Sequence, residues 1–112
     1  MNLHNKQLLF GELFPRFILI LHDLGYQVKI GEVKRTKNQA KLNELNGTGI
    51  SNSLHTKLLA ADIELYKNYQ HLTQLDDYKE AAEIWEKMHG YCRSGYYFGD
   101  GHHFSITHEG IK

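Results

Sequence analysis

The amino-acid sequence predicts an α+β fold in which a small, largely antiparallel sheet is flanked by helices. Apolar residues recur at helical spacing near the N-terminus and again over residues 77–90, whereas three shorter stretches have the patterns of strands. Helices and strands follow one another without a regular βαβ order, which favours antiparallel pairing. The 112 residues can bury one core, so we expect a single domain over residues 1–112.

The first predicted helix covers residues 6–24, where apolar residues recur at steps of three and four, as on one buried helix face. Pro15 lies inside this stretch. Either the helix kinks there, or a short helix ends and a second begins with Pro15 in its first turn. Gly25 is typical of a helix end. The buried face is predicted to comprise Phe10, Leu13, Phe14, Phe17, Leu21 and Leu24.

The middle of the chain is predicted to contain a strand, a helix, a loop and a second strand. Residues 26–30 alternate apolar and polar side chains, which is typical of a strand. A helix is predicted over residues 36–45, because its first residues, Thr-Lys-Asn-Gln, have the form of a capping box. The composition of residues 46–53 predicts a loop, and residues 59–66 predict a mostly buried strand.

The C-terminal third is predicted to contain a helix, a loop and the last strand. The helix opens at Asp77 with Glu80 and ends at Gly90. A Gly- and Tyr-rich loop follows, and residues 103–107 alternate as a strand does. The helix residues expected to face the core are Ala81, Ala82, Trp85 and Met88.

Composition argues against several classes of partner. The formal net charge is zero, whereas nucleic-acid binding draws on an excess of Lys and Arg. The apolar run at residues 17–21 is far shorter than the roughly 20 residues that cross a bilayer, so we expect no stable membrane insertion. Residues 1–6 lack the order of a signal peptide, so we expect synthesis in the cytoplasm. One cysteine, Cys92, cannot form an internal disulfide. We also expect the protein to be a monomer.

Two histidines and two aspartates have spacings that a metal could use. Six residues separate His55 from Asp62, and Asp62 lies in an apolar run, where an ionised carboxylate is costly to bury unless a cation or strong donors meet it. Asp100 lies three residues before His103. Two histidines and one carboxylate make a zinc site with its fourth position open for water. On spacing alone, a hydrogen-bonded histidine or an aspartate that caps a turn is the commoner explanation.

The order of motifs resembles a known family. Ser-x-His, Ala-x-Asp and a late Asp-x-x-His-Phe occur at residues 53–55, 60–62 and 100–104. This order resembles the zinc D-alanyl-D-alanine peptidase family, which includes D-alanyl-D-alanine dipeptidases and carboxypeptidases and the phage L-alanyl-D-glutamate endopeptidases. The chain is most similar to the phage endolysin branch, and the likeness covers nearly its whole length. Residues 25–36, Gln39-Ala40 and residues 103–112 are similar too.

The resemblance implies a zinc peptidase with the α+β fold shared with hedgehog-type domains. One Zn²⁺ per chain would be bound by His55, Asp62 and His103. Asp100 would be the catalytic base, and Arg35 a catalytic residue that binds substrate and stabilises developing charge. The residues implied to support the substrate pocket are Gln39 and Ser53. Without the resemblance, Arg35 reads as a surface arginine, and Gln39 as a helix cap.

Two departures from the family pattern and one ambiguity bear on the site. Leu58 stands where the family usually has glycine, so the bend after His55 is in question. Residues 93–99 keep aromatic side chains but lack the Trp-Gly-Gly turn of many phage relatives. His102 directly precedes His103, and neighbouring strand residues face opposite ways, so both cannot easily bind one metal. We favour His103, because it keeps the Asp-x-x-His spacing.

The function implied is hydrolysis of the L-Ala–D-Glu bond in the peptidoglycan stem peptide of a bacterial cell wall, by a phage-type endolysin that reaches the wall after release. Zinc would activate a water molecule, and Asp100 would accept its proton. The first alternative is a D-alanyl-D-alanine carboxypeptidase or dipeptidase of the same family, in which Arg35 grips a terminal carboxylate. The second is a zinc-stabilised binding module without catalytic activity.

Overall fold

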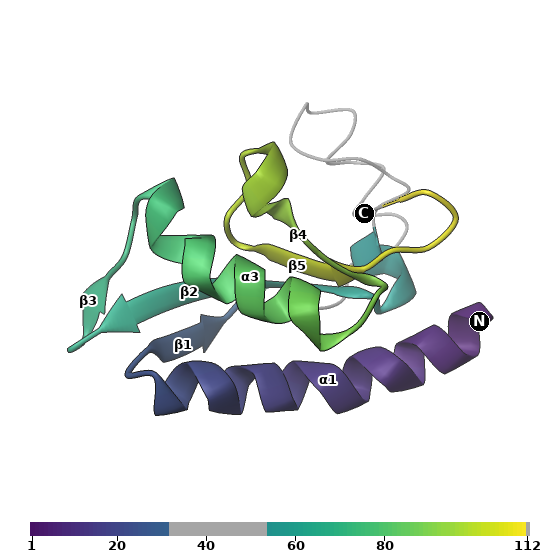
Figure 1. The fold of residues 1–112 in the computed structure, drawn as a ribbon, viewed down its shortest axis with the longest axis horizontal. Helices are drawn as coiled ribbons and strands as arrows, with labels where there is room; N and C mark the ends of the chain where they lie inside the picture. Colours follow the sequence, from purple (N-terminus) through teal and green to yellow (C-terminus); the bar gives the residue numbers. More distant parts are fainter. Residues whose placement is uncertain (32–53, 112) are drawn as a thin grey trace.

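The computed structural model describes residues 1–31 and 54–111. Over these residues, two α-helices cover one face of a five-stranded antiparallel sheet with the order β1-β2-β5-β4, and β3 pairs with β2 (Figure 1). The α+β class and the antiparallel sheet are therefore confirmed. The elements are α1 (Leu3–Asp23), β1 (Gln27–Ile30), η1 (Leu54–Lys57), β2 (Ala60–Lys67), β3 (Gln70–His71), η2 (Leu75–Tyr78), α3 (Lys79–Met88), β4 (Cys92–Ser94), η3 (Gly95–Phe98) and β5 (His103–Ile106).

Helix α1 is one continuous helix that passes through Pro15, so the alternative of two separate helices is wrong. It begins before the predicted start because the Asn2 side chain accepts the Asn5 N–H at 2.8 Å, which caps the first turn. Gly25 follows the helix with a φ of 95°, the left-handed conformation that glycine adopts readily. The predicted buried face is confirmed except at Leu24, which is 47% exposed because it lies beyond the last turn.

The core lies between the two helices and the sheet, and Trp85 of α3 is at its centre. Its ring packs against Phe17 of α1 and Phe104 of β5, with centroids 5.1 and 6.5 Å away. Its indole N–H donates to the Ser105 carbonyl at 3.0 Å, so the buried polar atom has a partner. Both helices are thereby held on the same face of the sheet. Among the helices of the described residues, none combines the length and apolar character needed to cross a bilayer.

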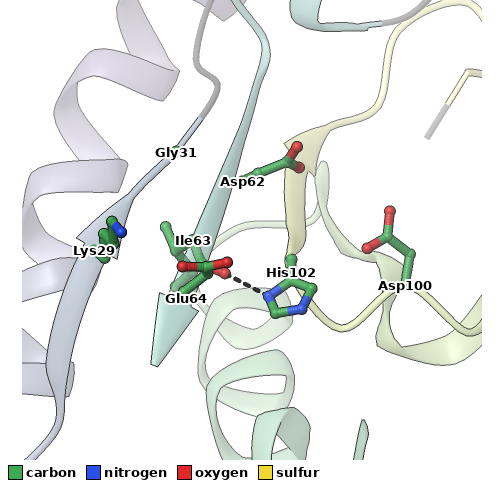
Figure 2. Close-up of a pocket in the computed structure, with 7 residues that line it drawn as sticks. All are labelled: Lys29, Gly31, Asp62, Ile63, Glu64, Asp100 and His102. Atoms are coloured by element: carbon green, nitrogen blue, oxygen red, sulfur yellow. Dashed lines mark hydrogen bonds between the residues drawn. The ribbon is translucent and has the colours of Figure 1, made fainter. Parts of the chain in front are cut away.

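The strands of the sheet have one face toward the helices and one away from them. In β2, Ala61, Ile63 and Leu65 are fully buried toward the core. Because side chains alternate along a strand, Asp62 and Glu64 point to the opposite face (Figure 2). We call this opposite face, on β1, β2 and β5, the open face. The predicted strands at residues 26–30, 59–66 and 103–107 are confirmed as β1, β2 and β5, with ends that differ by one residue.

The region after β3 differs from the prediction in two ways. The 3₁₀ turn η2 precedes α3, and Asp77 accepts the Gln74 N–H at 3.0 Å instead of opening the helix itself. Helix α3 ends at Met88 because His89 is extended, so Gly90 does not cap it. The predicted loop after α3 contains the strand β4 and the turn η3. The predicted helix at residues 36–45 and the predicted loop at 46–53 lie outside the described residues.

Candidate metal centre

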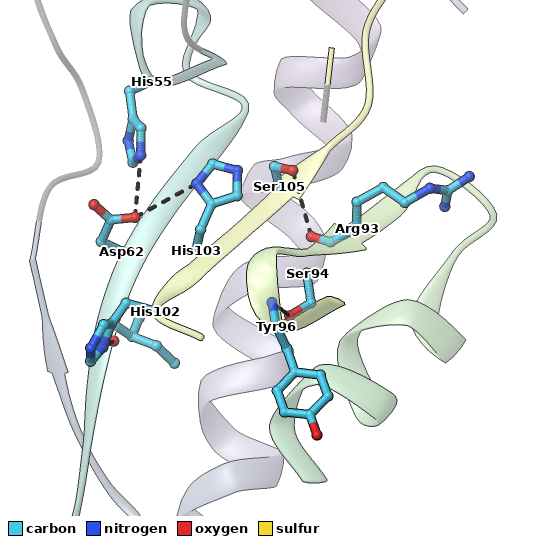
Figure 3. A network of polar contacts seen from close by, with 9 residues as sticks. His55, Asp62, Arg93, Ser94, Tyr96, His102, His103 and Ser105 are labelled. Carbon is cyan, nitrogen blue, oxygen red and sulfur yellow. Dashed lines mark hydrogen bonds and ion pairs between the residues drawn. The ribbon is translucent and has the colours of Figure 1, made fainter. Parts of the chain in front are cut away.

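Three elements bring His55, Asp62 and His103 together on the open face of the sheet (Figure 3). Asp62 of β2 is the direct partner of His103 in the antiparallel pairing of β2 with β5, so their side chains leave the same face side by side. His55 comes from η1, the short turn that precedes β2. The strand register therefore brings together Asp62 and His103, which are 41 positions apart in the sequence. The turn η1 adds His55, which lies close to Asp62 in the sequence.

The distances within this group fit a metal ion. His55 Nε2 lies 3.3 Å from Asp62 Oδ1, and His103 Nδ1 lies 3.7 Å from the same oxygen. One donor atom from each residue falls within 4.8 Å of the other two. Tetrahedral zinc with bonds of about 2.0–2.2 Å places its ligand atoms roughly 3.3–3.6 Å apart. The group could therefore hold a metal ion with only small side-chain adjustments.

The electrostatics of the group keep Asp62 ionised. Burial raises the pKa of its carboxyl, but hydrogen bonds and electrostatic interactions with His103 and His55 outweigh this effect and hold the pKa well below its usual range. Asp62 is therefore a carboxylate at neutral pH. Its side chain is 35% exposed, whereas those of His55 and His103 are 4% and 11% exposed. Solvent thus reaches the group from the side of the carboxylate.

The bend after His55 has the backbone that glycine would favour, although leucine occupies it. Leu58 has a φ of 56°, in the left-handed region that residues other than glycine and asparagine rarely adopt. The Leu59 N–H donates to the Leu54 carbonyl at 3.0 Å, and this bond closes the turn that carries His55. The leucine at this position therefore does not prevent the turn from directing His55 toward Asp62.

A turn after η3 places Asp100 beside the group. The Asp100 N–H donates to the Gly95 carbonyl at 2.7 Å, and the His103 N–H donates to the Asp100 carbonyl at 3.3 Å. Gly99 supplies the left-handed residue of this turn, with a φ of 87°. Asp100 is exposed, and together with Asp62 it lines a pocket of about 480 Å³ (Figure 2). A second carboxylate thus faces the pocket that opens beside the metal-binding residues.

His102 is held away from His55 and His103. Its Nδ1 lies 2.9 Å from the Ile63 carbonyl, which can only accept, so this nitrogen carries the hydrogen. Its ring packs edge-on against Tyr78, with centroids 4.7 Å apart. Figure 3 shows the ring on the far side of Asp62 from the other two imidazoles. The adjacent histidines therefore have different surroundings, and only His103 belongs to the group within metal-binding reach.

The other predicted site residues, Arg35, Gln39 and Ser53, lie outside the described residues, and their roles stay predictions. Sequence reasoning missed Gly95, which is buried against both Asp100 and His103. A side-chain carbon there would overlap the Asp100 carbonyl oxygen and lie 2.9 Å from His103 Cβ. No sequence signal could have shown this, because the contact arises only when η3 folds back onto β5.

Replacing Gly95 with alanine should disturb the metal centre. The added methyl group must displace the backbone of Asp100 or the side chain of His103, and overpacking of this kind costs about 1–3 kcal/mol in the free energy of unfolding. Displaced ligands should also lower metal affinity by about tenfold or more. Denaturant unfolding and metal titration measure the two effects. Gly90→Ala is the control, because a side-chain carbon there meets no atom within 4 Å. Equal behaviour of the two variants would contradict the close packing at Gly95.

Comparison with known proteins gives no further identification. A scan of the sequence against models of protein families finds no match, and a search of curated proteins finds none. The geometry of the His55, Asp62 and His103 group is therefore the main support for a function.

Proposed function

We propose that the protein is a zinc-dependent peptidase that cuts the L-Ala–D-Glu bond of the peptidoglycan stem peptide, as a phage-type endolysin does. The observation that carries this proposal is the meeting of His55, Asp62 and His103 at metal-binding distances, with Asp100 on the adjoining pocket. Two imidazoles and one carboxylate are the ligand set of catalytic zinc sites, which keep a fourth position for water or substrate. Nitrogen donors favour zinc over the hard cations Mg²⁺ and Ca²⁺.

Each residue of the site has a chemical task in this proposal. A zinc ion bound there would polarise the scissile carbonyl and lower the pKa of a water molecule. Asp62 contributes one negative charge, so a divalent ion with neutral His55 and His103 keeps a net positive charge. Asp100, on the solvent side of the pocket, accepts a proton from the attacking water and passes it to the leaving amine. We assign to Arg35 the stabilisation of the oxyanion that forms at the carbonyl.

The choice of substrate rests on the resemblance to the phage branch in residues 25–36 and 103–112, which lie far apart in the chain. The same likeness supports the hedgehog-type zinc-peptidase fold, with which the antiparallel sheet is compatible. Asp100 on the pocket argues against a zinc-stabilised module without catalytic activity, since such a module has no use for a base beside the metal. A thiol peptidase is also disfavoured, because Cys92 is buried and burial raises the pKa of its thiol to about 12.

Two synthetic peptides test this function and separate it from the carboxypeptidase alternative. One is an L-Ala–D-Glu stem peptide without a D-Ala–D-Ala end, and the other is a short peptide that ends in D-Ala–D-Ala. We expect the zinc-loaded protein to cut the first internally, to leave the second intact, and to lose activity with a chelator until zinc is restored. Release of D-Ala from the second peptide alone would favour the carboxypeptidase. Cleavage unaffected by the chelator would contradict the metal mechanism.

A further inference from the structure

The pocket beside the metal centre extends along β1 and β2 to a pair of opposite charges. Lys29 of β1 and Glu64 of β2 are direct partners in the antiparallel register, and both line the pocket that also contains Asp62 and Asp100. Figure 2 shows Lys29 and Glu64 next to each other on the open face. An ammonium and a carboxylate are thus held side by side at the end of the pocket away from Asp100.

Both of these charged groups are available to a ligand. Within residues 1–31 and 54–111, neither Lys29 nor Glu64 takes part in an ion pair. Their side chains also make no hydrogen bond to the described part of the chain. By contrast, the neighbouring Lys67 has its ammonium 4.5 Å from the centre of the Tyr26 ring. Lys29 and Glu64 therefore present one positive and one negative group that a ligand can pair with.

The position of this pair relative to the metal centre defines which part of a substrate it meets. Glu64 follows Asp62 by two residues on the same face of β2, a distance of about 7 Å along a strand. In the stem peptide D-Glu is joined to the third residue through its γ-carboxyl, so the third residue lies up to roughly 9 Å from the scissile carbonyl carbon, which the long Lys29 and Glu64 side chains can bridge. When the scissile carbonyl lies at the metal centre and the part of the peptide after the cut runs along β2 from Asp62 toward Glu64, the second residue after the cut reaches Lys29 and Glu64. In the stem peptide this is the third residue, a diamino acid.

We propose that Lys29 and Glu64 select a third residue whose side chain carries both an ammonium and a carboxylate, as diaminopimelate does. Lys29 pairs with the side-chain carboxylate and Glu64 with the side-chain ammonium. A lysine at the same position offers only the ammonium and leaves Lys29 without a partner. This inference rests on the proposed stem-peptide cleavage and adds the class of wall on which the enzyme acts.

Two stem peptides that differ only in the third residue test the proposal. With the zinc-loaded parent, we expect kcat/KM to be up to about fivefold higher for the diaminopimelate peptide than for the lysine peptide, the effect of one partly exposed ion pair. Lys29→Met should lower kcat/KM on the diaminopimelate peptide by that factor and leave the lysine peptide unchanged. Glu64→Gln should lower both, because both peptides carry the ammonium. Lys87→Met and Glu83→Gln, which are exposed on α3 on the other face, are the matched controls.

Failure of this inference differs from failure of the proposed function. Equal cleavage of the two peptides by the parent, or an equal effect of Lys29→Met on both, would overturn the assignment while stem-peptide cleavage stands. An equal effect of Lys29→Met on both peptides would mean that Lys29 pairs with the D-Glu carboxylate, which both peptides share. If neither peptide is cut, the proposed function fails, and calorimetric binding of the same peptides to Asp100→Asn decides the selectivity. Equal affinities would overturn it, whereas tighter binding of the diaminopimelate peptide would support it.

Discussion

Replacing His55 with alanine should remove both the metal ion and the activity. The parent should contain one zinc per chain, and His55→Ala should contain almost none, because two of the three protein donors do not form a catalytic site. Loss of a metal that stabilises transition-state charge by several kcal/mol predicts at least about a thousandfold fall in cleavage rate. Elemental analysis and peptide kinetics measure the two effects, and addition of zinc should raise the melting temperature of the parent alone.

Two further variants separate ligand loss from unfolding. His55→Gln retains most of the side-chain volume in the buried turn and should fold, yet bind zinc poorly. His102→Ala should keep its zinc, because the His102 ring is hydrogen-bonded to the Ile63 carbonyl and is not among the residues whose donor atoms lie together. Zinc retained in His55→Gln but lost in His102→Ala would show that the wrong histidine has been assigned.

Replacing Asp100 with asparagine should leave a folded, zinc-loaded protein that cleaves very slowly. Asparagine has the shape of aspartate but cannot accept the proton of the attacking water, and loss of a general base lowers rates by about a hundredfold to ten-thousandfold. Single-turnover cleavage of the stem peptide, with zinc content measured on the same sample, tests this. Asp23→Asn, exposed at the C-terminal end of α1, is the control for the loss of one negative charge and should cleave at the parent rate.

Asp62→Asn should differ from Asp100→Asn. His55 and His103 hold the pKa of Asp62 below its usual range, so a full negative charge is lost from the donor group itself. Zinc affinity should fall together with the rate. If Asp100→Asn loses zinc as well, Asp100 is a ligand and the assignment of the base is wrong. If it cleaves at near the parent rate, another group accepts the proton.

Local patterns were sufficient to predict α1 and the two strands, β2 and β5, that carry Asp62 and His103, but not the short turn η1 that carries His55. The buried face of α1 repeats over five turns, and β2 and β5 have enough alternating or apolar residues to be recognised without tertiary information. β4 has only three residues, and its partner β5 determines its conformation through pairs such as Cys92 with Ile106. A segment of that length has no periodicity to detect, so the sequence predicted a loop there.

The candidate site could be predicted only in part, and for a related reason. His55, Asp62 and His103 were candidates because of residue type and resemblance, but the pairing of Asp62 with His103 depends on strand register, which a single sequence does not specify. The same register places Lys29 opposite Glu64, and no motif indicated that pair. The bend at Leu58 has a left-handed backbone although the residue is leucine, which the sequence alone did not predict.

Mass spectrometry of purified bacterial wall after digestion tests the central claim most directly. Wall peptides would be compared after treatment with chelator-stripped protein and with the same protein reloaded with zinc. We predict that only the zinc-loaded sample releases stem peptides with a new D-Glu N-terminus and leaves the glycan strands intact. New reducing sugar ends, loss of only terminal D-Ala, or identical products with and without zinc would contradict the assignment of a zinc endopeptidase.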